Sequence, residues 1–326
     1  MNARRRFVMS CAALAAAPYA SGPSAQTVKT VRIIVPFPAG GGTDVLARLV
    51  AEKLRGSYAD AAIVENRVGA SGRIGIEVVK NAEPDGSTLL FTPDFPLTVY
   101  PHSFRKLAYD PLVDFAPVAI VARSNLALAA GPALPANIRT VAEFIAWAKS
   151  NPKNALYATT SPGGTPHFVG VMLARDAGLD IAPVHYKGGA QALQDLLGGQ
   201  IALSVNPVGE LLPHVKSGKI RVLATTGPAR SHFLPDTPTM VESGYPQIIV
   251  APWLGFLAPA RSPVETVARL SAAIGAAVKL PEVAQSFEKF GNEPAPSNPA
   301  TLAATIRADL AAWGPIVKAS GFTAED

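Results

Sequence analysis

Three glycine-rich stretches stand where helices are expected to begin, and their chemistry is that of anion binding. The stretch Gly40-Gly41-Gly42-Thr43-Asp44 follows the apolar run VRIIV, and Gly163-Gly164-Thr165 repeats the order of strand, glycines, threonine and helix. A third stretch, GASGRIG (residues 69–75), places glycines three residues apart before another helical segment. Unpaired N–H groups and the positive end of the peptide dipoles favour an anion at a helix start, and glycine permits close approach.

The same residues also have a structural interpretation. Asp44 can serve the first N–H groups of its own helix as a first-turn acid or cap, and Arg73 can either meet a ligand carboxylate or stay in solvent. One helix terminus contributes about 0.3–1 kcal/mol when exposed, or up to about 2 when partly buried, whereas a micromolar ligand needs about 8 kcal/mol. We therefore expect the ligand to be bound from two sides, with the two Gly-Gly-Thr helix starts forming opposing walls of one cleft.

Enzymatic arrangements are incomplete in this sequence. The run VRIIV, the glycine loop, a helix and a strand ending in Glu65 imitate a dinucleotide-binding unit, but the glycines are consecutive and Pro36 and Pro38 interrupt the loop. The five histidines show no metal-ligand spacing, and no serine stands in a G-x-S-x-G motif. We expect a hydrogen-bonding structural role for His167. A binding protein without metal or cofactor is favoured, with a Rossmann oxidoreductase or a hydrolase as the alternative class.

Strands and helices alternate along the chain, which predicts parallel sheets covered by helices. Two such series predict two α/β lobes. The strands are expected at residues 31–35, 61–65, 87–92, 155–160, 181–186, 200–205 and 220–226, and the helices at 43–55, 72–81, from 165, up to 197, from 264 and at 299–318.

Two apolar segments, residues 114–130 and 245–260, are predicted to pass between the lobes. Two passages mean that one lobe is inserted in the other, so we assign residues 26–124 and 251–326 to lobe 1 and residues 125–250 to lobe 2. The hinge is expected near residues 122–126 and 248–254, and the carboxyl-terminal helix is expected to pack on lobe 1.

The amino terminus has the pattern of an export signal. Arg4, Arg5 and Arg6 precede an uncharged apolar stretch and then small residues, so we expect a signal peptide over residues 1–25, exported by the general or the twin-arginine route. The only cysteine, Cys11, lies inside this segment, which excludes disulfides and thiol chemistry from the mature chain. Its removal leaves 26 basic and 24 acidic residues, a balance that does not favour nucleic-acid binding.

Seven blocks of sequence resemble one known family. They are VPFPAGGGTDVLAR (35–48), NRVGASGRIG (66–75), PDGSTLLFT (84–92), YDPLVDFAPVA (109–119), VHYKGGAQALQDLLGGQI (184–201), GKIRVLATTGPAR (218–230) and PDTPTMVESGYP (235–246). In this order they resemble the Bug family of extracytoplasmic solute-binding proteins, the receptors of tripartite tricarboxylate transporters.

The resemblance implies an α/β, two-lobed periplasmic binding protein of type II-like, Venus flytrap form, with a ligand cleft between the lobes. It implies a periplasmic monomer that holds a small carboxylate with backbone amides and delivers it to the membrane permease subunits of a transporter, or that docks on a receptor kinase as a sensor. By this likeness the cleft residues are Phe37, Ala39, Gly41, Gly42, Thr43, Asp44, Ser71, Gly72, Arg73 and Thr92 of lobe 1, and Thr159, Gly163, Gly164, Thr165 and Asn206 of lobe 2.

Four positions depart from the family pattern or look unusual for it. Gly164 and Pro166 stand where serines are common, and Asn206 stands where an aspartate is frequent. Asp94, in the stretch TPDFP, is interpreted as a cap of the following turn, with pairing to a ligand amino group as the alternative. These departures imply that the ligand of a relative need not be the ligand of this chain.

Overall fold

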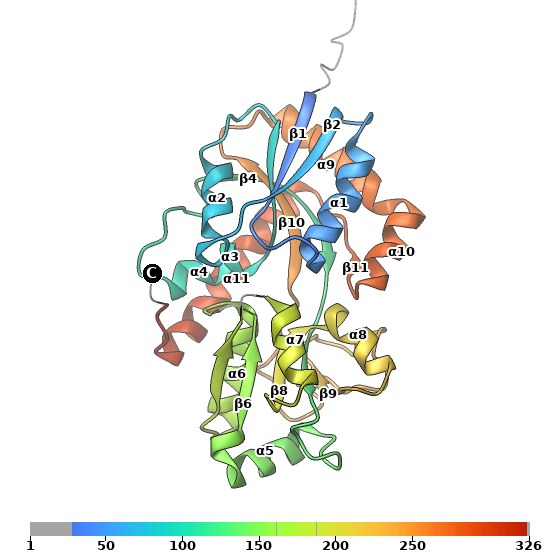
Figure 1. Ribbon diagram of the computed structural model, residues 1–326. Helices are drawn as coiled ribbons and strands as arrows, with labels where there is room; N and C mark the ends of the chain where they lie inside the picture. Colours follow the sequence, from blue (N-terminus) through green and yellow to red (C-terminus); the bar gives the residue numbers. More distant parts are fainter. Residues whose placement is uncertain (1–27, 161, 187, 325–326) are drawn as a thin grey trace, which may run out of the picture.

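The computed structural model describes residues 28–160, 162–186 and 188–324, which form two α/β lobes (Figure 1). One lobe is built on a six-stranded sheet of order β11-β4-β10-β3-β1-β2 and the other on a five-stranded sheet of order β7-β6-β8-β5-β9. We call them lobe 1 and lobe 2. The α/β class and the two-lobed form expected from the sequence are confirmed. The predicted signal peptide and its cleavage site lie outside the described residues.

Lobe 1 contains most of the elements predicted for the first half of the chain. Its strands are β1 (Val28–Val35), β2 (Ala59–Asn66), β3 (Thr88–Pro93), β4 (Phe115–Arg123), β10 (Trp253–Pro259) and β11 (Glu293–Pro294). Its helices are α1 (Gly42–Leu54), η1 (Ala70–Gly72), α2 (Arg73–Lys80), α3 (Phe95–Thr98), α4 (Tyr100–Ser103), α9 (Val264–Lys279), α10 (Pro281–Lys289) and α11 (Pro299–Ser320). Strand β1 lies between β3 and β2, and its second half is buried on both faces: Val31, Ile33 and Val35 belong to one core cluster and Ile34 to another, as is typical of parallel sheets covered by helices.

Lobe 2 has the same construction. Its strands are β5 (Leu126–Ala130), β6 (Leu156–Thr159), β7 (Ala182–His185), β8 (Leu203–Pro207) and β9 (Arg221–Thr225). Its helices are α5 (Val141–Ser150), η2 (Pro152–Asn154), α6 (Thr165–Ala177), α7 (Gly189–Leu197) and α8 (Val208–Lys216). The sequence analysis missed α3, α4, α5, α8 and α10, of which α3 and α4 are single turns.

Strand pairing turns the loops of the two lobes toward each other. Strands β2 and β3 run parallel to β1, and Trp253, at the start of β10, is paired with Arg123, at the end of β4. The chain therefore leaves lobe 1 at the carboxyl edge of its parallel strands and crosses through residues 124–125. Leu126, the first residue of β5, pairs with Pro207, the last residue of β8, which runs parallel to β6. The carboxyl ends of both sets of parallel strands thus meet at the crossings.

The carboxyl-terminal helix α11 packs on both lobes. Leu302 and Ile306 belong to the core of lobe 1, as expected, whereas Trp313 and Val317 belong to the core of lobe 2. A helix of 22 residues is about 33 Å long, and its first half contacts lobe 1 while its second half contacts lobe 2. The exact division of the chain between the lobes stays a prediction.

Among the described residues no helix combines the length and the apolar character that a bilayer crossing requires.

Candidate functional site

The loop between β1 and α1 presents backbone N–H groups at the edge that faces lobe 2. Gly40 has a φ of 81°, and Gly41 precedes the helix in an extended conformation without a side-chain cap. The first hydrogen bond of α1 joins the Val45 N–H to the Gly41 carbonyl at 3.1 Å. The N–H groups of the residues just before Val45 therefore have no carbonyl of a preceding helical turn to bond. A Cβ added to Gly42 would meet nothing within 4 Å. Gly41 and Gly42 are therefore open to a ligand, and Ala39 and Thr43 beside them are exposed and half-exposed.

Asp44 has an internal role in this loop. One carboxylate oxygen accepts the Gly40 N–H at 2.9 Å, the other accepts the Asn66 side-chain amide at 2.9 Å, and Arg48 forms an ion pair with the group. Burial opposes ionisation, but these hydrogen bonds and the guanidinium together lower the pKa of Asp44. The carboxylate therefore holds the loop instead of presenting itself to a ligand. The structural interpretation of Asp44 is the one that the contacts support.

The second glycine loop packs against the first. Ala70, Ser71 and Gly72 all have positive φ values, of 46°, 56° and 92°. The ring of Phe37 lies 3.3 Å from the position of a Cβ added to Gly72, so a larger residue there would push against the first loop. The Tyr100 hydroxyl donates to the Ser71 carbonyl at 3.0 Å. Of the predicted residues, Phe37, Ser71 and Gly72 are thus brought together in one packed unit.

Arg73 is held by the protein. Its Nε donates to the Ala70 carbonyl at 3.0 Å, and its guanidinium stacks over the Phe104 ring at 4.2 Å. With Ser71, these residues line a hollow of about 520 Å³. Pro162 and His185 from lobe 2, and residues 322–324 from the carboxyl terminus, complete its wall. The hollow therefore joins the two lobes at the second glycine loop.

The end of β3 contains two buried polar groups. Thr92 is fully buried, and neither its hydroxyl oxygen nor Asp94 Oδ1 has a hydrogen-bond partner among the described residues. Burial and the nearby Asp309 raise the pKa of Asp94 to about 8. Asp94 precedes α3, yet its side chain makes no capping hydrogen bond. The expected cap is wrong, because the carboxyl group is packed inside lobe 1 with only 4% of the residue exposed.

The loop between β6 and α6 is turned toward the carboxyl terminus of the chain. Gly163, with a φ of 68°, accepts a hydrogen bond on its carbonyl from the Ser103 hydroxyl at 3.3 Å and lies against Phe322. Its N–H donates to His167 Nδ1 at 3.2 Å. The expected structural hydrogen bond of His167 is confirmed. Burial, with the neighbouring His185, lowers the pKa of His167 to about 3, so this ring stays neutral.

The threonines of this loop point into the protein. Thr159 and Thr165 are buried, and the Thr165 hydroxyl oxygen has no hydrogen-bond partner among residues 28–160, 162–186 and 188–324. Gly164 precedes α6 in an extended conformation. That this start forms a wall opposite Gly40–Asp44 stays a prediction, because the contacts of Gly163 are with Ser103 and Phe322.

Another glycine pair begins a helix at the interlobe edge of lobe 2, and the sequence analysis did not select it. Gly188 has a φ of 136°, and Gly189 is the first residue of α7. Next to it, Asn206 at the end of β8 donates to Glu210 Oε2 at 3.4 Å. The signal was available, since these glycines follow a strand in the same manner as Gly41 and Gly42. Glu210 offered no such signal, because its contact with Gly189 is a tertiary one.

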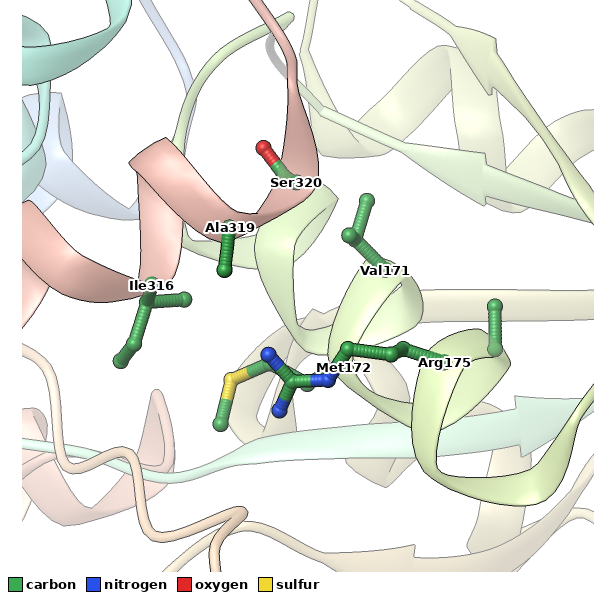
Figure 2. A pocket seen from close by; sticks show the side chains of 7 residues that line it. Val171, Met172, Arg175, Ile316, Ala319 and Ser320 are labelled. Atoms are coloured by element: carbon green, nitrogen blue, oxygen red, sulfur yellow. The ribbon is translucent and has the colours of Figure 1, made fainter.

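A second hollow lies outside this region. Figure 2 shows it between α6 and α11, with a volume of about 260 Å³, lined by Val171, Met172, Ala174, Arg175, Ile316, Ala319 and Ser320. None of these is a predicted site residue. No group of three or more potential metal ligands occurs in the part of the chain that the structure describes.

Comparison with known proteins gives consistent matches over the whole fold. The family model "Tripartite tricarboxylate transporter family receptor" matches residues 46–322. Protein BugT of Bordetella pertussis is 32% identical over 324 residues, which cover 98% of this chain and 99% of BugT.

Solved structures agree. R. palustris Rpa4515 with adipate has a TM-score of 0.85 at 31% identity, covering 90% of this chain and 98% of that one. The periplasmic binding protein BugD has a TM-score of 0.83 at 31% identity, covering 91% and 99%. MatC from Rhodopseudomonas palustris with bound malate has a TM-score of 0.81 at 29% identity, covering 89% and 99%.

Proposed function

The chain belongs to the tripartite tricarboxylate transporter receptor family, and from this premise we propose that it captures a small organic acid between its lobes in the periplasm. The relatives include a periplasmic binding protein and structures holding adipate and malate, both of them dicarboxylates. The closed, loaded form then docks on the permease subunits of a transporter. The protein acts as a monomer and performs no chemical reaction on its ligand.

The observation that supports this proposal is that, in both lobes, a glycine-started helix follows the carboxyl end of a parallel strand. In lobe 1 the start of α1 has open space at Gly42, and in lobe 2 the start of α7 is half-exposed at Gly188 and Gly189. Both follow carboxyl ends of parallel strands that meet at the crossings. Helix starts at these edges suit a carboxylate, because their N–H groups and dipoles favour negative charge.

The energetics require both lobes. A single partly buried helix start supplies up to about 2 kcal/mol, which is far below the roughly 8 kcal/mol of a micromolar complex. Closure around the ligand removes water and strengthens each contact. The proposed contact residues are Phe37, Ala39, Gly41, Gly42, Thr43, Ser71, Gly72, Arg73, Gly163, Gly164, Gly188 and Gly189, with Asp44 holding the first loop. Thr92, Thr159, Thr165 and Asn206, which the sequence also predicted, are buried within the lobes and are not proposed as contacts.

A thermal-shift screen tests the proposal. Purified mature protein is heated with mono-, di- and tricarboxylates, aromatic acids and amino acids, and hits are confirmed by calorimetry. A ligand that binds only the native state raises the melting temperature by mass action. At least one carboxylate class should do so saturably. A saturable complex with a nicotinamide cofactor, and no response to any carboxylate, would favour the oxidoreductase alternative.

A further inference from the structure

A polar chain leads from the interior of lobe 2 to its interlobe edge. The Ser204 hydroxyl donates to Asn206 Oδ1 at 3.1 Å, and both residues are fully buried. The Asn206 amide donates in turn to Glu210 Oε2 at 3.4 Å and to the Gly189 carbonyl at 3.5 Å. Asn206 is the next-to-last residue of β8, and Glu210 lies in the first turn of α8, so this chain of hydrogen bonds ends in a carboxylate at the edge that faces lobe 1.

This carboxylate packs closely against the start of α7. A Cβ added to Gly189 would overlap Glu210 Oε2, so only glycine is compatible with the carboxylate in this place. The residue before Glu210, Gly209, lies against lobe 1, because a Cβ added to it would overlap the Phe290 carbonyl. Figure 1 shows α7 and α8 in the part of lobe 2 nearest to lobe 1. Glu210 therefore lies between two helix starts at the level where the lobes meet.

The carboxylate has acceptor capacity that the protein does not use. Among the described residues, which exclude Lys187, no basic side chain forms an ion pair with Glu210. The hydrogen bond from Asn206, at 3.4 Å, is long. An ionised carboxylate accepts about four hydrogen bonds. Burial raises the pKa of Glu210 to about 7, which is consistent with a carboxylate that lacks a compensating charge.

A ligand in the cleft decides whether this capacity is satisfied. A second ligand carboxylate beside Glu210 would place like charges together, which is unfavourable at any pH where both are ionised. A hydroxyl or ammonium group would instead donate a charge-assisted hydrogen bond.

We infer that Glu210 is a specificity-determining residue, which selects carboxylates bearing a hydroxyl or ammonium donor at their lobe 2 end over dicarboxylates of the same length. This inference rests on the proposed function. It assigns the ligand carboxylate to the start of α1 and the ligand donor to Glu210.

Calorimetry with matched ligands tests the inference. The first set is succinate, 4-hydroxybutyrate and 4-aminobutyrate, and the second is adipate, 6-hydroxyhexanoate and 6-aminohexanoate. At pH 8.5, where Glu210 is ionised, the wild-type protein should bind a donor-bearing member at least about tenfold more tightly than the dicarboxylate of its set, the effect of one charge-assisted hydrogen bond. Glu210→Gln should reduce this preference to less than about threefold, because the amide tolerates both ligand types.

The control is Glu265→Gln, since Glu265 is also a first-turn glutamate but is exposed on α9 of lobe 1. It should leave the preference unchanged. A wild-type preference for the dicarboxylate overturns the inference even if Glu210→Gln fails to fold, and so does a donor preference that survives in a folded Glu210→Gln protein. If carboxylates of every class fail to bind the wild-type protein, the proposed function itself fails.

Discussion

Three acidic residues near the crossings have three different surroundings. Asp44 receives a backbone N–H, an amide and a guanidinium, and its pKa is lowered. Asp94 is packed near another acid, and its pKa is raised to about 8. Glu210 faces the interlobe edge with one long hydrogen bond. The carboxyl group therefore holds a loop at Asp44, is unfavourable to ionise at Asp94, and has unused acceptor capacity at Glu210.

At the residue scale, Gly42→Val should weaken binding of any carboxylate found in the screen by at least about tenfold, because a branched side chain at the start of α1 blocks close approach to the N–H groups. The fold should survive, since a Cβ there meets nothing within 4 Å and Gly42 does not have a positive φ. Calorimetry measures the affinity, and circular dichroism checks the fold.

Gly275→Val is the matched control, because Gly275 lies within α9 and its Cβ would also have open space. It should keep the wild-type affinity. Equal affinities of the wild type and Gly42→Val would remove this loop from the site.

Asp94→Asn should change how stability depends on pH. The carboxyl group has a pKa of about 8 in the folded protein and about 3.9 in the unfolded chain. Between these values the native state binds the extra proton, so the free energy of unfolding falls as pH rises from about 4 to 8. The substitution should raise the free energy of unfolding at pH 8, relative to that at pH 5, by at least about 1.4 kcal/mol, the value of one pKa unit.

Urea unfolding of both proteins at pH 5 and pH 8 measures this difference. Asp60→Asn, at an exposed position of the edge strand β2, is the control and should leave the pH dependence as in the wild type. An Asp94→Asn protein with the wild-type pH dependence would contradict the assignment of the raised pKa.

At the element scale, glycine has a different structural role at each of three helix starts. Gly42 leaves space, Gly72 takes a left-handed conformation beneath the Phe37 ring, and Gly189 makes room for a carboxylate. Only the first of these is a feature of the backbone terminus alone. The other two depend on what packs against the helix.

Asp44→Ala tests whether the β1–α1 loop must be held for binding. The substitution removes the bonds to Gly40, Arg48 and Asn66, so the loop should lose its fixed conformation. We expect a loss of about 1–2 kcal/mol in the free energy of unfolding, as for removal of a helix cap, and a weaker affinity for the ligand.

Thr140→Ala provides the comparison at another helix. Thr140 forms a capping box with Glu143 at the start of α5, which Figure 1 shows at the end of lobe 2 remote from lobe 1. Its loss should cost about 1 kcal/mol of stability and leave the affinity unchanged. If both variants lose stability and both keep full affinity, the loop conformation is not needed for binding.

At the scale of the whole molecule, contacts other than the two crossings join the lobes. His232 and Glu293 approach to 3.2 Å, and the Phe322 ring lies 4.5 Å from His167 between ring centres. The Ala324 N–H donates to the Ser103 carbonyl at 2.7 Å. The carboxyl-terminal segment therefore connects α4 of lobe 1 to α6 of lobe 2, as its place beside both lobes in Figure 1 illustrates.

Phe322→Ala should lower the free energy of unfolding by about 1–2 kcal/mol, because a half-buried ring and its edge contacts are lost. Phe322→Leu, which keeps most of the apolar surface, should lose less than half as much. Chemical denaturation monitored by fluorescence compares them. Wild-type stability in the alanine variant would show that this segment does not tie the lobes together.

The sequence by itself determined the α/β class, most strands and the glycine-rich helix starts, because these depend on alternating apolar runs and on backbone conformations within a few residues. The family was also accessible, since its blocks are continuous segments of chain. The sequence also predicted that Gly41 and Gly42 stand at an open helix start and that His167 has a hydrogen-bond partner within the protein. Both predictions depend on residues close together in the chain.

Only the tertiary structure decided how the site residues are used. Ser103 bonds Gly163 from 60 positions away, Asn66 bonds Asp44 from 22 positions away, and Glu210 meets Gly189 across two helices. Such contacts depend on the packing of strands, helices and lobes, which no local pattern encodes. Burial then sets the ionisation of Asp94 and Glu210, because desolvation of a carboxylate is a property of its surroundings and not of its neighbours in sequence.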